Sequence, residues 1–561
     1  MTRAEEIFDT AFNACELPED AVGNELRVFG PPGTGKTTLL AAHVERAAAR
    51  FGPKGVLVMS HTRAAAHELV RRKVALAEQN VATLHSVCFR ALGKPRIAET
   101  KGLREKWNER YPNWALSEHS QQAEELPQET RGDRELRELN QLRATMTPEE
   151  RWPASLRPFW LAWCAWKKSE GALDFTDLIE EAWRKVPIAP GNPAAIICDE
   201  AQDFTSLQLA LIRSWAKACT YLVLAGDEDQ SLYAYAGASP LNLLTPPLPP
   251  HQIRVLRQSH RVPASVHRYA HAQWTNRLTV RQEKEFHPRS APGYVRRIKT
   301  GAGDPERLVN RLERSVAEGK ETMLLASANF ALQNVLAELR RRGVPFSNRY
   351  RPENLKWNPM GGKGHGAASR LRALLAGRER LDNPHGLWTG SQVRLWCAWL
   401  ATAGTLRRGA KELLQSLDFE RFYGADWLEQ NLETEARISL LAVLERGSAA
   451  TAEWWRRRVL PDYQRDAQYV ANVVIRSGVQ HLSETPKLTV GTIHSVKGGS
   501  AEAVYLLPDL TNRWKADDNA GGTRRDSLLR LFYVASTRTS DELWLCDPYR
   551  RGSSMLLGAA A

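Results

Sequence analysis

Short apolar runs alternate with longer amphipathic stretches in the first part of the chain. LRVFG at 26–30 and GVLVMS at 55–60 have the length and composition of buried strands, and a helix is expected from Thr37. The strand pattern returns in AAIICDE at 194–200 and YLVLAGD at 221–227. Strands that alternate with helices predict a parallel α/β sheet, which binds its ligand at the carboxyl ends of the strands.

A second strand–helix pattern follows TPPLPPHQ at 245–252, a run whose prolines predict a stiff connector. Its expected strands lie in GYVRRIKT, ETMLLASA, KLTVGTIHS, AVYLLPDL and ELWLCD. Residues 515–527 (KADDNAGGTRRDS) are expected to form a mobile loop. We therefore expect an α/β protein with two parallel-sheet cores, each interrupted by a mostly helical insertion. The expected boundaries are 1–90 and 190–250 for the first core, 91–189 for its insertion, 251–350 and 485–561 for the second core, and 351–484 for its insertion.

Composition narrows the class of partner. The 561 residues carry a formal net charge of +13, which favours a polyanionic partner, although a merely basic surface is the alternative. Seven cysteines without a CxxC pair argue against a zinc ribbon and a disulfide framework, and they predict reduced thiols in a cytoplasmic protein. The sequence has no apolar run of about eighteen residues, so no membrane role is expected.

GPPGTGKT at 30–37 has the G-x4-G-K-[ST] spacing of a P-loop, and it lies between an expected strand and an expected helix. Its glycines allow backbone N–H groups to surround phosphates at the start of a helix. We expect Lys36 to neutralise the β- and γ-phosphates and Thr37 to ligate Mg²⁺. The candidate nucleotide-binding residues here are Gly30, Pro31, Pro32, Gly33, Thr34, Gly35, Lys36, Thr37 and Thr38. A P-loop alone leaves a kinase, a GTPase and a motor open.

Two adjacent carboxylates end the apolar run AAIICDE. Asp199 at the end of a strand can hold the metal ion, and Glu200 can orient an attacking water. This pair favours hydrolysis over transfer to a bound acceptor. A second acidic segment, GDEDQSLYAYAGA at 226–238, follows the next expected strand.

Together these segments resemble the ordered motifs of superfamily 1 DNA helicases of the UvrD/Rep/PcrA type. GDEDQSLYAYAGA is similar to the third motif, QSHRVP at 258–263 to the fourth, VGTIHSVKGGSAEAVYL at 490–506 to the fifth and LFYVASTR at 531–538 to the sixth. SHTRAAAHEL at 60–69, TLHS at 83–86 and DFTDLI at 174–179 resemble further segments of that family. The resemblance implies two RecA-like cores with ATP bound in the cleft between them.

The resemblance also implies roles for single residues. Gln230 would sense the γ-phosphate, and Arg261 and Arg538 of the second core would reach the same phosphate. Lys36, Glu200, Gln230, Arg261 and Arg538 are the catalytic candidates, and His260 stands where the family stacks a tyrosine on adenine. The candidate nucleic-acid contacts are Tyr235, as a base-stacking residue, and the strand-gripping residues Thr62, Arg63, Thr83, His85, Thr492 and His494.

The chain departs from the family pattern mainly around the nucleotide base and sugar. No glutamine precedes the P-loop, and Ser500 falls where the family has a ribose-contacting glutamate. Ala236 replaces an arginine of the third motif. We therefore expect hydrolysis to be preserved and the preference for ATP over GTP to be relaxed.

The resemblance implies an ATP- and Mg²⁺-dependent DNA helicase or translocase that moves 3′→5′ on single-stranded DNA and acts on 3′-tailed duplexes. DNA repair, recombination and phage-related DNA processing are the expected settings. The alternative is a nucleic-acid-gated ATPase switch, or the motor subunit of a defence complex whose nuclease is another chain. A protein partner such as a nuclease or a repair factor is possible for the helicase and for the alternative functions. Trp160, Trp163 and Trp166 are expected to form a buried helix face and not a nucleic-acid contact.

Overall fold

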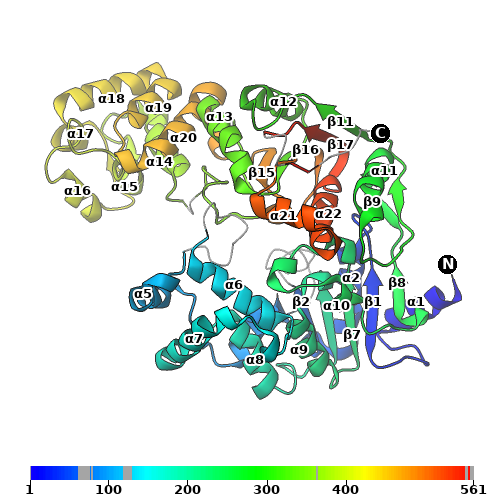
Figure 1. The fold of residues 1–561 in the computed structure, drawn as a ribbon. Helices are drawn as coiled ribbons and strands as arrows, with labels where there is room; N and C mark the ends of the chain where they lie inside the picture. The colour runs from blue at the N-terminus through cyan, green and yellow to red at the C-terminus, as the bar shows by residue number, and fades with distance from the viewer. Residues whose placement is uncertain are drawn as a thin grey trace. The chain divides into compact units, whose positions relative to one another are not determined.

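The computed structural model of the chain describes residues 2–60, 76, 80–117, 129–361, 364–549 and 554–555. The chain forms two compact units (Figure 1). Unit 1 consists of Met1–Val295, Leu510–Asp541 and Leu557–Ala561, and unit 2 of Arg296–Asp509 and Glu542–Leu556. Strands and helices occur in both units, so the fold class is α/β, as predicted.

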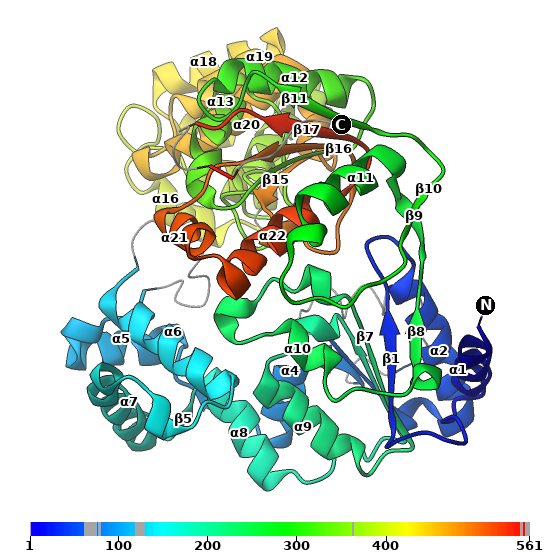
Figure 2. The same cartoon turned by 45° about the vertical axis from the view of Figure 1, so that its right-hand side comes forward.

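A six-stranded parallel sheet forms the centre of unit 1. Its strands are β1 (Glu25–Phe29), β2 (Val56–Ser60), β3 (Val81–Thr83), β6 (Ala195–Asp199), β7 (Tyr221–Gly226) and β8 (Ile253–Val255), in the order β3-β2-β6-β7-β1-β8. Figure 2 shows β7, β1 and β8 side by side. Phe29 pairs with Gly226, and Ser60 pairs with both Asp199 and Thr83. The carboxyl ends of these strands therefore meet at one edge.

Helices cover both faces of this sheet. The helices of the unit 1 core are α1 (Arg3–Ala14), α2 (Lys36–Phe51), α4 (Leu84–Ala91), α8 (Phe175–Lys185), α9 (Ser206–Ala216) and α10 (Pro240–Leu244). Successive strand residues point to opposite faces, so Ile196 packs in the cluster that contains Trp215 of α9, whereas Ile197 packs in the cluster that contains Val44 of α2. This two-sided burial explains why the strands are continuous apolar runs.

The segment between β3 and β6 adds a separate helical core rich in tryptophan. Its helices are α5 (Lys101–Arg110), α6 (Arg131–Ala144) and α7 (Arg157–Glu170), and β4 (Arg96–Ile97) pairs with β5 (Ala172–Leu173). Trp163 and Trp166 of α7 are buried and pack with Trp107 of α5, as the helical spacing predicts. Trp160 is only partly buried.

Unit 1 continues past residue 250, where the sequence pattern places the end of the first core. The side chain of Gln252 is buried, and it binds back to the start of the chain by accepting from Val22 N at 2.6 Å and donating to Glu25 O at 2.8 Å. These bonds place β8 beside β1. β9 (Gln258–Pro263), α11 (Ala264–Gln273) and β10 (His287–Arg289) follow in the same unit, and β9 pairs with β10.

Residues 515–527 are helical, so the prediction of a loop is wrong. They belong to α21 (Asn512–Ala520) and α22 (Gly522–Ser536), which meet at Gly521 (Figure 1). The hydroxyl of Thr511 accepts from Trp514 N at 3.2 Å and begins α21. Asp526 of α22 accepts from the backbone N–H groups of Thr279 and Val280 at 3.0 Å. Capping and these distant contacts order a segment whose glycines and charges suggest a turn.

The second sheet belongs to unit 2, apart from the first residues of two of its strands. Its strands are β11 (Tyr294–Ile298), β12 (Thr322–Ala326), β15 (Leu488–Thr492), β16 (Ala501–Leu507) and β17 (Thr539–Cys546), in the order β11-β17-β16-β12-β15. β12 pairs in parallel with both β15 and β16. The helices α12 (Pro305–Ala317) and α13 (Gln333–Arg342) precede and follow β12. The two parallel sheets with their helices are the RecA-like cores of the fold.

The stretch between α13 and β15 is mostly helical. Its helices are α14 (Ala367–Leu375), α15 (Gly390–Cys397), α16 (Ala410–Leu413), α17 (Ala425–Asn431), α18 (Thr434–Arg446), α19 (Ser448–Arg456) and α20 (Gln464–Ser477), with a short pair of strands β13 (Trp388–Thr389) and β14 (Phe422–Tyr423). One hydrophobic cluster joins these helices to the sheet, since it includes Leu324 of β12, Leu371 of α14 and Trp455 of α19.

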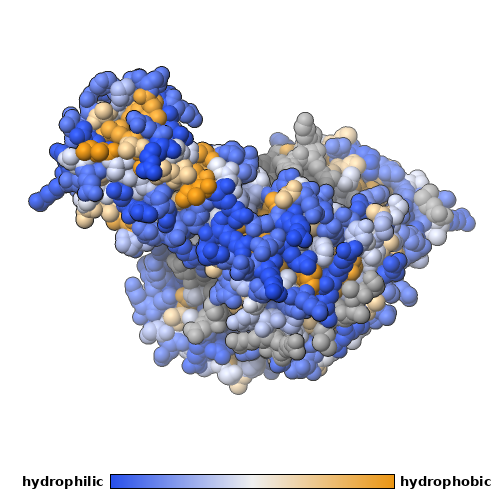
Figure 3. All heavy atoms as spheres, turned by 90° about the horizontal axis from the view of Figure 1, so that it is seen from above, coloured by the Kyte–Doolittle hydropathy of each residue, from blue (hydrophilic) through white to orange (hydrophobic). Residues whose placement is uncertain are grey.

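The face of the molecule drawn in Figure 3 is mostly hydrophilic, with hydrophobic residues in small separate patches. Within the described parts of the chain, every helix is too short or too polar to span a lipid bilayer.

Candidate nucleotide and nucleic-acid sites

The P-loop connects β1 to α2 at the carboxyl edge of the unit 1 sheet. Gly30 N donates to Gly226 O at 3.1 Å, so the loop starts beside the end of β7. Gly33 has φ +76°, and a Cβ at this position would lie 2.6 Å from the Cβ of Arg261. Only glycine fits both this conformation and this close approach.

Lys36 is the first residue of α2 and is buried. Its ammonium donates to Gly30 O within the loop itself. Burial and the Arg261 guanidinium lower the pKa of Lys36, while the carboxylates of Glu200, Asp227 and Asp199 act in the opposite direction. The lysine therefore lies near Asp199 and Glu200, the two carboxylates that the sequence assigns to hydrolysis.

Thr37 and Asp199, the two predicted metal ligands, are in contact. The Thr37 hydroxyl donates to Asp199 Oδ2 at 3.2 Å. Burial and the neighbouring Glu200 carboxylate raise the pKa of Asp199 to about 6. A hydroxyl and a carboxylate are hard oxygen donors, which suit Mg²⁺, so the residues present fit the predicted ion.

Glu200 has φ 55° and ψ 39°, a left-handed conformation that is uncommon outside glycine. Gln202 holds the carboxylate in place by donating from Nε2 to Glu200 Oε2 at 2.7 Å. The Oε1 of Gln202 accepts from Asp227 N at 3.0 Å. Gln202 thus joins the segment after β6 to the segment after β7, a link that the sequence motif did not reveal.

Gln230 is bonded at both ends of its amide. Its Nε2 donates to Asp227 Oδ2 at 2.7 Å, and its Oε1 accepts from Arg538 Nη2 at 2.8 Å. Arg538 follows α22 and is 2% exposed. Two residues that are 308 positions apart in the sequence, and that share a predicted role at the γ-phosphate, are therefore in direct contact.

Arg261 and His260 lie beside the P-loop. His260 N donates to Gly33 O at 2.9 Å, and the hydroxyl of Ser259 donates to Pro32 O at 2.8 Å. The side chain of His260 is exposed, and that of Arg261 is partly buried. Lys36, Thr37, Asp199, Glu200, Gln230, Arg261 and Arg538 all belong to unit 1.

Sequence reasoning missed Lys284, whose side chain is 2% exposed and pairs with Asp227, Glu228 and Asp229. It also missed Arg530, whose Nε donates to Glu228 O at 3.0 Å. Neither residue belongs to a motif that we recognised. The available signal was indirect: three consecutive carboxylates after a buried strand require cations nearby.

Tyr235, Thr83 and His85 also belong to unit 1. Tyr235 lies in a short 3-10 turn (Ala234–Ala236), is partly buried, and its ring centroid is 6.0 Å from that of Tyr233. Thr83 caps α4 by accepting from Ser86 N at 3.3 Å. The ring of His85 packs edge-on against Phe175, and burial lowers the pKa of His85 to about 4, so it is neutral at physiological pH.

The remaining nucleic-acid candidates are elsewhere. Thr492 and His494 belong to unit 2, where Thr492 is buried at the end of β15 and His494 is partly buried just after it. The Thr492 hydroxyl accepts from Ser495 N at 3.3 Å. Thr62 and Arg63 lie outside the described residues.

One edge of the sheet holds a P-loop after β1, two carboxylates after β6 and a glutamine–arginine pair. These features define a P-loop nucleotide hydrolase core. Residues 15–246 match the family model of the UvrD/REP helicase N-terminal domain. This part of the chain is therefore similar to the N-terminal domain of UvrD/REP helicases.

Two curated relatives share parts of the sequence. YjcD of Bacillus subtilis (strain 168), which has a provisional name as an ATP-dependent DNA helicase, is 26% identical over 246 residues, or 39% of this chain and 32% of YjcD. The ATP-dependent DNA helicase Rep of Buchnera aphidicola subsp. Schizaphis graminum (strain Sg) is 23% identical over 203 residues, or 32% of this chain and 30% of Rep. The chain thus spans about a third of the length of the curated relatives it matches.

Proposed function

We propose that the protein is an ATP-dependent DNA helicase or translocase that moves 3′→5′ along single-stranded DNA. The observation that carries this proposal is the Arg538–Gln230–Asp227 contact, because it joins the predicted γ-phosphate sensor to the edge that holds the P-loop. The names of the two relatives, Rep as an ATP-dependent DNA helicase and YjcD provisionally so, agree with it.

The residues of the site divide the work of hydrolysis. Lys36 neutralises phosphate charge, and Glu200, held by Gln202, orients the attacking water. Arg261 and Arg538 stabilise the negative charge that spreads over the phosphoryl oxygens, for which a forked guanidinium is suited. Thr37 and Asp199 would hold Mg²⁺, which supplies Lewis-acid polarisation of the phosphates when bound.

Several of the proposed nucleic-acid contacts would lie near the same edge of the sheet. Thr83 pairs with Ser60, which pairs with Asp199, so β3 ends two strands away from the carboxylates. Tyr235 lies five residues after Gln230 and offers a ring for stacking on a base, which is worth roughly 1–3 kcal/mol per base. His85 is neutral and would act through hydrogen bonds to phosphate and not through charge. Thr62, Arg63, Thr492 and His494 complete the proposed set.

The test combines ATP hydrolysis with strand separation. We expect single-stranded DNA to stimulate hydrolysis, and a 3′-tailed duplex to be unwound faster than a 5′-tailed one. Glu200→Gln should abolish both activities while nucleotide binding remains. Tyr235→Ala should weaken the stimulation by DNA, whereas Tyr235→Phe, which keeps the ring, should preserve it.

Each other outcome has a defined meaning. Absence of stimulation by both DNA and RNA would defeat the helicase proposal. Stimulation without unwinding would favour a translocase, a nucleic-acid-gated switch or a motor that needs a nuclease partner. Faster unwinding of the 5′-tailed duplex would overturn the proposed direction.

A further inference from the structure

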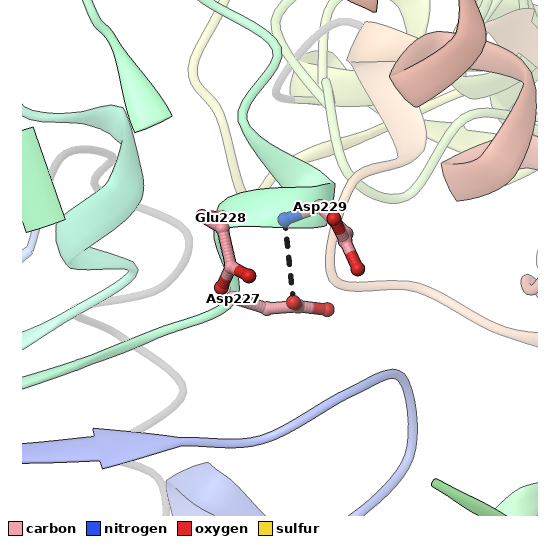
Figure 4. A group of neighbouring side chains, drawn as sticks. All are labelled: Asp227, Glu228 and Asp229. Atoms are coloured by element: carbon pink, nitrogen blue, oxygen red, sulfur yellow. Dashed lines mark hydrogen bonds between the residues drawn. The ribbon is translucent and has the colours of Figure 1, made fainter. Parts of the chain in front are cut away.

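The short turn after β7 carries three consecutive carboxylates in the interior of unit 1. Asp227, Glu228 and Asp229 are all buried. One carboxylate oxygen of each residue lies within 4.8 Å of those of the other two, and Figure 4 shows the three side chains gathered on one side of the turn. Three negative charges at this distance in a buried site need a cation.

Lys284 provides that cation for all three carboxylates, while Arg281 pairs with Asp229 alone, at 3.2 Å. The Lys284 Nζ lies 2.8 Å from Asp227 Oδ1, 2.5 Å from Glu228 Oε1 and 3.3 Å from Asp229 Oδ2. The ammonium therefore occupies the position among these oxygens where a metal ion could bind. Burial opposes the charge on Lys284, but the carboxylates raise the pKa of Lys284 well above its ordinary value, so the lysine is charged.

The contact extends from Lys284 to the predicted sensor of the γ-phosphate. One oxygen of Asp227 binds Lys284 and the other accepts from Gln230 Nε2 at 2.7 Å. Gln230 Oε1 in turn accepts from Arg538 at 2.8 Å. Because the two oxygens of Asp227 have separate partners, the position of its carboxylate fixes which end of the Gln230 amide faces Arg538.

The segment that carries Lys284 is itself fastened to the same elements. Gln282 N donates to Glu228 Oε1 at 3.0 Å. Arg530 of α22 donates to Glu228 O at 3.0 Å and also to Val280 O. Lys284 is thus held at a defined position relative to both the acidic turn and α22.

We propose that Lys284 is a positioning residue that orients Gln230, through Asp227, for recognition of the γ-phosphate. The proposal deepens the proposed function and rests on it, since it requires that the site bind ATP. A neutral side chain at 284 would leave Asp227 and Glu228 as buried charges without their lysine. The Asp227 carboxylate would then take up a proton or move toward another cation, and either change frees the Gln230 amide to rotate.

Lys284→Met is the informative variant, because methionine has a similar length and no charge. The experiment measures nucleotide discrimination. We define this discrimination ratio as the dissociation constant of ADP divided by that of the non-hydrolysable analogue adenylyl-imidodiphosphate, both measured with magnesium. We expect this ratio to fall at least about tenfold, with the dissociation constant of ADP little changed. The kcat for ATP should fall by a similar factor, while KM changes less.

The insertion offers a matched control. Lys167 is also buried, and it pairs with Asp174 and Asp177, far along the sequence from the acidic turn. Lys167→Met removes an ammonium from two carboxylates, and the Lys167 side chain is 6% exposed against 2% for Lys284. It should lower the melting temperature as Lys284→Met does, without changing the discrimination ratio. A loss that results from general destabilisation would affect both variants alike.

A second variant covers the case in which Lys284→Met does not fold. Asp227→Asn keeps the shape of the side chain and removes the charge that links Lys284 to Gln230. We expect it to lose discrimination as Lys284→Met does, and the double variant to be no worse than either single one, because the two act through one contact.

The outcomes separate this inference from the proposed function. A wild-type protein that does not bind or hydrolyse ATP would defeat the proposed function itself. An active wild type whose discrimination ratio survives in Lys284→Met, or in Asp227→Asn if the former does not fold, would overturn the role of Lys284. Effects of the two changes that multiply in the double variant would also overturn it.

Discussion

Replacing Arg538 by lysine tests whether the contact with Gln230 serves hydrolysis. The guanidinium of Arg538 donates from Nη2 to Gln230 Oε1 at 2.8 Å and from Nε to Val534 O at 2.9 Å. Lysine keeps the charge, but its single nitrogen cannot make both bonds in this geometry. A hydrogen bond from a charged group contributes about 1.5–3 kcal/mol, which corresponds to a loss of roughly 10- to 150-fold in rate.

The loss should appear in kcat, because the charge on the phosphoryl oxygens that Arg538 stabilises develops in the transition state. ATP hydrolysis at saturating single-stranded DNA measures it, with KM for ATP changing less than about threefold. Arg524→Lys is the control, since Arg524 is exposed on the same helix, α22. A kcat for Arg538→Lys within about twofold of that of an active wild type would refute the reasoning.

Three further predictions concern the same unit. Gly33→Ala should weaken binding of a fluorescent nucleotide at least about tenfold, because the new Cβ would lie 2.6 Å from that of Arg261, whereas Gly171→Ala (φ +58°, nothing within 4 Å) should not. Two arginines hold the pKa of Glu5 at about 2 against an ordinary 4.5, so its charge contributes stability above pH 4.5 that is lost as the pH falls through 2. Glu5→Gln should therefore lower stability in urea by about 1–2 kcal/mol at pH 7 but not near pH 2, and Glu6→Gln, an exposed change in the same turn, should have little effect at either pH. Finally, hydrolysis rates with ATP, GTP and CTP should lie within about tenfold of one another, and a strict requirement for ATP would contradict the expected loss of base recognition.

Local patterns predicted the parts of the site that are close together in the sequence. The P-loop lies between β1 and α2 because an apolar run, a glycine-rich turn and a helix follow one another within 26–51. Asp199 and the acidic turn meet the P-loop because parallel strands end at one edge, which follows from the fold class. The position of Trp163 followed from helical spacing alone.

Long-range pairings were accessible only through the family resemblance, or not at all. No local feature connects Gln230 with Arg538, and only the ordered motifs suggested that they share a ligand. Lys284 stands in a charged segment, RQEKEF, that looks like exposed surface until the carboxylates that enclose it are placed. The start of α22, within 515–527, was expected to be a loop for a similar reason, because Asp526 meets its partners, Thr279 and Val280, almost 250 residues away.

The doubly bonded amide of Gln230 has a consequence for repeated turnover. A phosphate oxygen can only accept a hydrogen bond, so it can engage Gln230 only through the amide Nε2 and leaves the bond from Arg538 to Oε1 in place. The Nε2 group has two hydrogens and the bond to Asp227 uses one of them, so recognition of a phosphate is compatible with both bonds. The amide can then keep the same orientation before a nucleotide binds and after it is released, and each turnover starts from the same arrangement.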